Sequence, residues 1–185
     1  MKKTVLALMA LAAVVPLAAA SLADFKADMG RASTVAAERF FVTPAKIEIV
    51  EDAAAPNGKA LVAKLSALKE GVKLGRYDVT VKLTAEEAAK IREVSFDAKV
   101  SDRKAFGWSM LYFRKPTVWN RCLRYHIPNN QSFKIGEWQH FAVPVSAFTP
   151  EGDGIPLNEA RIFVITFFTV GGPVEIAVAN IACAE

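Results

Sequence analysis

From residue 46 onward, hydrophobic and polar residues alternate with a period of two, in short runs that turn residues separate. This period places successive side chains on opposite faces of an extended strand, whereas an amphipathic helix requires a period near 3.6. The runs predict nine strands, at residues 46–51, 59–67, 76–83, 92–101, 107–115, 121–127, 138–145, 161–169 and 174–183. Nine short strands without long helices favour an all-β fold, specifically a two-sheet antiparallel β-sandwich.

Two local signals interrupt the strands. Thr84 can cap a short helix that ends near Lys90, and Glu87, three residues after Thr84, completes the pattern of a capping box. The run 171–173, Gly-Gly-Pro, predicts a tight turn between neighbouring strands, because glycine adopts positive φ readily and proline fixes its own φ.

The chain has 185 residues, of which 52% are hydrophobic, so it is long enough for one globular domain with its own core. Residues 1–20 have a cationic start, an apolar run and a small-residue end, which predicts a signal peptide cleaved near Ala20. The alternative is an uncleaved anchor, but the apolar run 5–17 is shorter than the ~20 residues of a typical bilayer span. We therefore expect a secreted or periplasmic protein with a single domain at 21–185 and no membrane partner after cleavage.

Removal of Lys2 and Lys3 with the signal leaves 23 − 2 = 21 basic residues against 19 acidic ones, a net charge of +2. A charge this small gives no electrostatic basis for a nucleic-acid partner.

Four segments carry a resemblance to a known family: Val94–Val100, Trp138–Phe148, Arg161–Ile165 and Val174–Ile181. The chain resembles the galactose-binding-like jelly rolls, which include many carbohydrate-binding modules of secreted bacterial glycan-degrading systems. In that family a Trp opens a strand that ends in a Pro-hydrophobic-Ser-x-Phe corner, as Trp138 and the residues up to Phe148 do here. The resemblance implies a jelly roll with Trp138 as part of the fold, and a poly- or oligosaccharide as partner.

Many members of the family hold a structural calcium through an acidic residue in the closing strand and another near the start of the domain. This chain has Ala179 at the first of these positions, and Lys26 where the family often has an acid. Calcium requires several anionic oxygen ligands. We therefore expect no calcium at that site, and the alternative is a calcium bound elsewhere through Asp24 or Asp28. The sequence predicts no other metal and no cofactor.

The strands predicted at 107–115 and 121–127 hold most of the candidate binding residues. Alternation in the first strand places on one face Phe106, Trp108, Met110, Tyr112 and Arg114. In the second strand, Cys122, Arg124 and His126 share a face. If the two strands pair, rings and guanidinium groups line one patch. Rings stack on the apolar faces of sugars, and guanidinium groups bind hydroxyls or a uronate carboxylate.

The predicted ligand-binding residues are Trp108, Tyr112, Arg114, Trp119, Arg124 and His126. Trp119 is included because it lies in a polar loop, where an aromatic residue has less structural reason to occur. The alternative is that the strand aromatics belong to the core, that the two arginines are solvated strand ends and that Trp119 packs over a sheet edge.

Export would allow a single disulfide between Cys122 and Cys183, because disulfides persist in oxidising compartments. The alternative is two buried thiols that do not meet, since the sequence does not fix the distance that a bridge requires.

The sequence favours a non-catalytic binding module over an enzyme. The two histidines, His126 and His140, have neither a nucleophile motif nor metal-ligand spacing. A polysaccharide lyase is one alternative, since Tyr125 or His126 offers a base and Arg114 or Arg124 a carboxylate-neutralising group. Tyr125 and His126 point to opposite faces of a regular strand, however, so both cannot serve one site. A non-catalytic assembly or adhesion protein with a protein partner in the cell envelope is the other.

Overall fold

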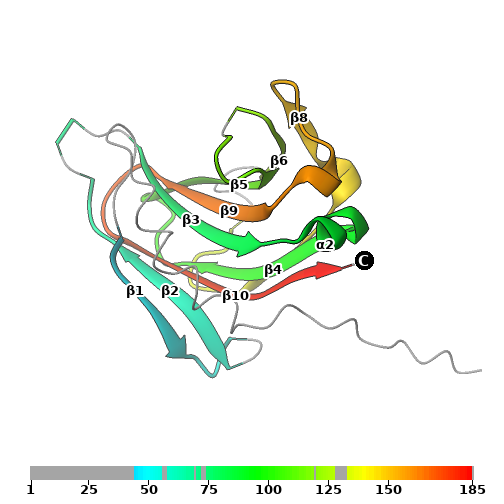
Figure 1. Ribbon diagram of the computed structural model, residues 1–185. Coiled ribbons are helices and arrows are strands. Elements are labelled where there is room, and N and C mark those ends of the chain that lie inside the picture. Colours follow the sequence, from blue (N-terminus) through cyan, green and yellow to red (C-terminus); the bar gives the residue numbers. More distant parts are fainter. Residues whose placement is uncertain are drawn as a thin grey trace, which may run out of the picture.

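The chain folds into two five-stranded antiparallel sheets that stack face to face as a β-sandwich (Figure 1). The computed structural model describes residues 44–184 except 56–57, 69, 72–73, 119 and 128–132. The predicted signal at 1–20, Asp24, Lys26, Asp28 and Trp119 lie outside the described residues. The first sheet has the order β1-β2-β10-β4-β7 and the second has the order β3-β9-β5-β6-β8.

The strands are β1 (Pro44–Glu51), β2 (Lys59–Leu65), β3 (Gly75–Lys82), β4 (Glu93–Val100), β5 (Phe106–Arg114), β6 (Cys122–Ile127), β7 (Gln139–Pro144), β8 (Thr149–Glu151), β9 (Ile162–Thr169) and β10 (Val174–Ala184). Two 3₁₀ turns, η1 (Val145–Ala147) and η2 (Leu157–Glu159), flank β8. All nine predicted strands are present, which confirms the all-β sandwich. The sequence did not predict β8, whose three residues are too few to show alternation.

The predicted helical turn is α2 (Ala85–Lys90), and its capping box is complete. The Thr84 hydroxyl accepts a hydrogen bond from the Glu87 amide at 3.2 Å, and the Glu87 carboxylate accepts one from the Thr84 amide at 2.7 Å. The turn buries Ala88 in the core. None of the helices in the described part of the chain is long and apolar enough to cross a membrane.

The core lies between the two sheets and takes alternate residues of most strands. Phe96 and Val94 of the first sheet enter it from one side, and Phe163 and Phe167 of the second sheet enter from the other, all with 0% exposure. Each fully buried side chain of this size contributes about 2 kcal/mol of transfer free energy. The turn at 171–173 joins β9 to β10 and so crosses from one sheet to the other. The sequence predicted a tight turn between neighbouring strands here, and the two strands that it joins follow one another in the chain but lie in different sheets.

The alternate residues of β3, β5, β6 and β9 point away from the core and form the outer face of the second sheet. The prediction that Phe106 belongs to this face was wrong. The register between β5 and β9 shifts between Phe106 and Trp108, so Phe106 turns inward. Its ring packs edge-on against the ring of Phe133, with the two centroids 4.8 Å apart. The irregularity leaves Trp108 on the outer face and places Phe106 in the core.

Candidate functional site

The outer face of the second sheet gathers the candidate binding residues because β5 pairs with both β6 and β9. Tyr112 lies directly opposite Arg124 of β6 and Val164 of β9. Arg114 lies opposite Cys122, and Met110 opposite His126. Five of the six predicted residues, Trp108, Tyr112, Arg114, Arg124 and His126, therefore share one face, and Trp119 is not described.

At one end of this face, an aromatic pair is partly open to solvent. The rings of Trp108 and Phe168 stack with centroids 4.7 Å apart and an interplanar angle of 24°. The guanidinium carbon of Arg76 lies over the Phe168 ring, 5.8 Å from its centroid. Both aromatic residues are of intermediate exposure. A flat ring pair backed by a cation is a platform on which an apolar molecular face can stack.

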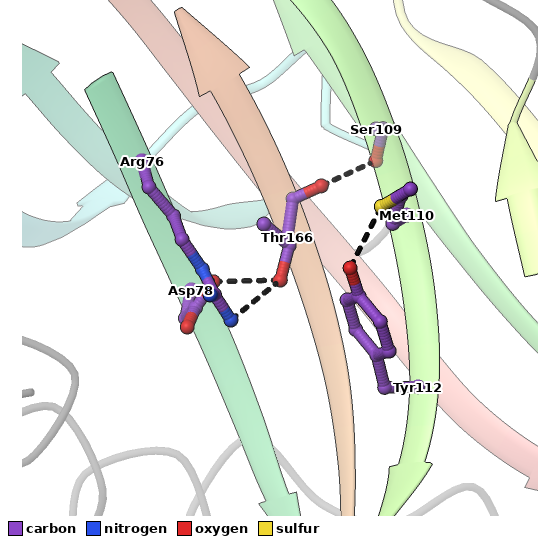
Figure 2. A network of polar contacts seen from close by, with 6 residues as sticks. All are labelled: Arg76, Asp78, Ser109, Met110, Tyr112 and Thr166. Carbon is purple, nitrogen blue, oxygen red and sulfur yellow. Dashed lines mark hydrogen bonds and ion pairs between the residues drawn. The ribbon is translucent and has the colours of Figure 1, made fainter. Parts of the chain in front are cut away.

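A polar network lies next to this platform and fixes the position of Arg76 (Figure 2). The Arg76 Nε donates to Asp78 Oδ1 at 2.7 Å, and the Thr166 hydroxyl donates to the same oxygen at 2.6 Å. From the core side, the Ser109 hydroxyl donates to the backbone oxygen of Thr166 at 2.8 Å. Because β3, β9 and β5 each supply members, the network ties together the three strands under the platform.

Tyr112 occupies the middle of the face, half-buried between its neighbours. Its hydroxyl donates to the sulfur of Met110 at 2.7 Å (Figure 2). Burial, with smaller contributions from Glu151 and Asp78, raises the pKa of Tyr112 to about 12 although nearby Arg76 opposes the shift. The hydroxyl is thus a neutral hydrogen-bonding group at ordinary pH and not a base.

Arg124 is the more open of the two predicted arginines. One terminal nitrogen of its guanidinium lies 3.1 Å from Glu151 Oε1, and its side chain is 42% exposed. The other carboxylate oxygen of Glu151 accepts a hydrogen bond from the Cys122 thiol at 3.4 Å. A tight turn after β8 holds Glu151 in this position. Gly152 has φ +60° there, and a Cβ would collide with the carbonyl oxygen of Asn120.

Arg114 lies on the same face but is 5% exposed. Its guanidinium donates to the carbonyl oxygens of Lys115 at 3.2 Å and Pro116 at 2.9 Å, so it holds the turn that follows β5. Burial lowers the pKa of Arg114, although the nearby Asp78 carboxylate opposes that shift. Arg114 is neither a solvated strand end nor an open ligand contact, and we assign it a positioning role for the turn.

The histidines do not form a common site. His126 is exposed on the outer face of the second sheet, whereas His140 belongs to β7 of the first sheet. His140 Nδ1 lies 3.0 Å from Asp97 Oδ1, and the Asn180 amide donates to the other carboxylate oxygen at 2.7 Å. Tyr125 points to the core side and packs against Phe148 at 5.8 Å, opposite to His126. Within the described ranges, no group of three or more potential metal-binding side chains comes together.

The two cysteines are free thiols in different sheets. Cys122 is fully buried beneath Glu151, and Cys183 is partly buried against the core. Of the two possibilities that the sequence left open, a Cys122–Cys183 disulfide or two thiols that do not meet, the structure has the second. Trp138, which the resemblance placed in the fold, packs on the outer side of the first sheet in a small cluster with Val62 and Ala177.

Sequence reasoning missed the residues that β3 and β9 contribute to the face, namely Arg76, Asp78, Thr166 and Phe168. The alternation of Arg76 and Asp78 in a strand was visible in the sequence. What was missing was the order β3-β9-β5, which brings residues some 90 positions apart in the chain into contact.

Comparison with solved structures shows the same fold in carbohydrate-binding modules. A family 11 module from Clostridium thermocellum, solved in complex with a β-1,3-1,4-mixed-linked tetrasaccharide, is 16% identical with a TM-score of 0.50, covering 76% of this chain and 82% of that one. The solution structure of the module CtCBM11 is 16% identical with a TM-score of 0.51, covering 83% and 92%. A family 30 module is 11% identical with a TM-score of 0.50, covering 75% and 83%.

No family model matches the sequence, and no curated protein matches it. The likeness at these identities concerns architecture. The chain is a β-sandwich of the jelly-roll type found in carbohydrate-binding modules.

Proposed function

We propose that this chain is an exported, non-catalytic glycan-binding module whose ligand lies on the outer face of the second sheet. The observation that carries the proposal is the platform of Trp108 stacked on Phe168, with Arg76 behind it and Arg124 and His126 farther along the same face. Stacked rings bind the apolar face of a sugar, and the polar groups beside them satisfy its hydroxyls. The shared fold with modules that include an oligosaccharide complex supports this proposal.

Export is part of the proposal and rests on the signal-like segment 1–20. The arrangement of side chains favours binding over a lyase reaction. Tyr125 packs against the core on the other side of the sheet from His126, and Tyr112 has a pKa raised to about 12, so neither tyrosine is poised to remove a proton beside His126.

An open sheet face buries little ligand surface, so we expect dissociation constants on the order of micromolar to millimolar for a single module. The test is a screen of poly- and oligosaccharides on a glycan array, followed by calorimetric titration of the best ligand. Trp108→Ala should weaken binding about tenfold because the stacked ring is lost, whereas Trp108→Phe should retain most of it.

Two histidine substitutions, one on each sheet, serve as matched variants that test which face binds the glycan. His126→Ala should weaken binding because His126 lies on the proposed face, and His140→Ala should not because His140 lies on the other sheet. Thermal melting of each variant checks that the fold is intact. A wild-type protein that binds no glycan in the screen would overturn the proposal, as would equal weakening by the two histidine substitutions.

A further inference from the structure

The two outer faces of the sandwich differ in charge, although the whole chain is only mildly basic. Among the described strand side chains, the outer face of the second sheet carries four basic and two acidic groups, a balance of 4 − 2 = +2: Arg76, Lys82, Arg114, Arg124, Asp78 and Glu151. The outer face of the first sheet carries two basic and four acidic groups, a balance of 2 − 4 = −2: Lys64, Lys99, Glu48, Glu93, Asp97 and Glu175. The aromatic platform therefore lies on the positive face.

The two acids on the positive face are already engaged within the protein. Asp78 accepts hydrogen bonds from Arg76 and from Thr166. Glu151 is shared between Arg124 and the Cys122 thiol. The balance of +2 already counts both carboxylates, so the face as a whole favours a ligand that carries negative charge.

Arg124 is the group best placed to receive that charge. Glu151 forms an ion pair with one of its terminal nitrogens, at 3.1 Å. The ion pair restrains the side chain while its 42% exposure leaves part of the donor fork in solvent. A guanidinium fork matches a planar carboxylate through two parallel hydrogen bonds, which are stronger than bonds to a neutral hydroxyl.

The position of Arg124 relative to the platform sets the form of the ligand. Arg124 lies opposite Tyr112, which is four residues along β5 from Trp108, or about 13 Å at the rise of a strand. This is more than one sugar ring spans, so a ligand that touches both points must be an oligomer. We infer that the site binds acidic oligosaccharides, with a uronate carboxylate on Arg124 and another sugar ring stacked on Trp108 and Phe168. The inference rests on the proposed glycan-binding function and adds the class of glycan.

The test compares uronic acid oligomers with the same oligomers after reduction of each carboxylate to a primary alcohol, so that linkage and length stay fixed. Galacturonate, glucuronate, mannuronate and guluronate oligomers cover the common backbones. We expect at least one acidic oligomer to bind about tenfold more tightly than its reduced partner, and this difference should shrink at high ionic strength. Arg124→Gln should abolish the difference, because it removes the partner of the carboxylate and lowers the affinity for the acidic oligomer to that for the reduced one. Arg92→Gln, the same charge change at an exposed arginine after α2, should preserve it.

The outcomes separate the two proposals. Equal affinity for acidic and reduced oligomers would overturn the inference and leave the glycan-binding function standing. An acidic preference that survives Arg124→Gln would overturn the assignment to Arg124. If a sulfated form of the reduced oligomer bound as tightly as the uronate, charge alone would suffice and the carboxylate assignment would fall. Absence of binding to every one of these oligomers, with binding to another glycan of the array, would overturn the inference alone. Absence of binding to every glycan of the array as well would overturn both the inference and the glycan-binding function.

Discussion

Single residues of this chain owe their chemical state to what the sheets place around them, and the cysteines show this most directly. Burial, followed by the hydrogen bond to Glu151, raises the pKa of Cys122 from an ordinary value of 9.0 to about 11. Burial raises the pKa of Cys183 from 9.0 to about 12. A thiol reacts as its thiolate, so both side chains are expected to be unreactive near neutral pH.

The raised pKa values predict that both thiols react slowly in the folded protein. At pH 8, a shift of the thiol pKa from 9 to 11 lowers the thiolate fraction about a hundredfold, from about one in ten to about one in a thousand. Ellman's reagent should therefore react with native protein at least about a hundredfold more slowly than with protein unfolded in denaturant. Unfolded protein, purified without reductant, should show two thiols per chain that react with Ellman's reagent. If no thiol of the unfolded monomer reacted, Cys122 and Cys183 would form a disulfide, and the arrangement with two free thiols in different sheets would be wrong.

At the scale of elements, the sequence predicted what local pattern determines. The strand positions follow from alternation, and the helix α2 follows from its capping box, because both signals involve residues close in the chain. The three-residue β8 and the irregularity at Phe106 were not predictable, because each depends on pairing with a distant strand. The burial of Arg114 depends likewise on how the turn after β5 folds back over it.

The helix cap gives a prediction at this scale. Thr84→Ala removes the hydroxyl that accepts from the Glu87 amide, and loss of such a cap costs about 1 kcal/mol. We expect urea denaturation to show a free energy of unfolding lower by about that amount, with an unchanged dependence on urea. Thr84→Ser, which keeps the hydroxyl, should stay close to wild type. A Thr84→Ala variant as stable as Thr84→Ser would mean that the cap contributes nothing to the stability of the domain.

For the whole molecule, sequence alternation placed the β5 and β6 residues on one face but could not supply the strand order of either sheet. That order, β3-β9-β5-β6-β8, adds Arg76 and Phe168 to the aromatic platform and Asp78 and Thr166 to the network below it. Strand order depends on contacts between residues far apart in sequence, and period-two alternation carries no information about which strands pair. The sequence thus predicted the part of the proposed ligand surface that lies on β5 and β6, but not the part on β3 and β9.

Both sheets contribute to a single core, so they should unfold together. Two tryptophans report on the two sides of the sandwich: Trp108 on the outer face of the second sheet and Trp138 on the outer side of the first. One variant, Trp108→Phe with Trp119→Phe, keeps Trp138, and the other, Trp119→Phe with Trp138→Phe, keeps Trp108. In each variant, the fluorescence and far-ultraviolet circular dichroism midpoints in guanidinium chloride should coincide. If the Trp108 signal changed at a lower denaturant concentration than the dichroism of the same variant, the second sheet would unfold before the first, and the shared core would not couple the two sheets.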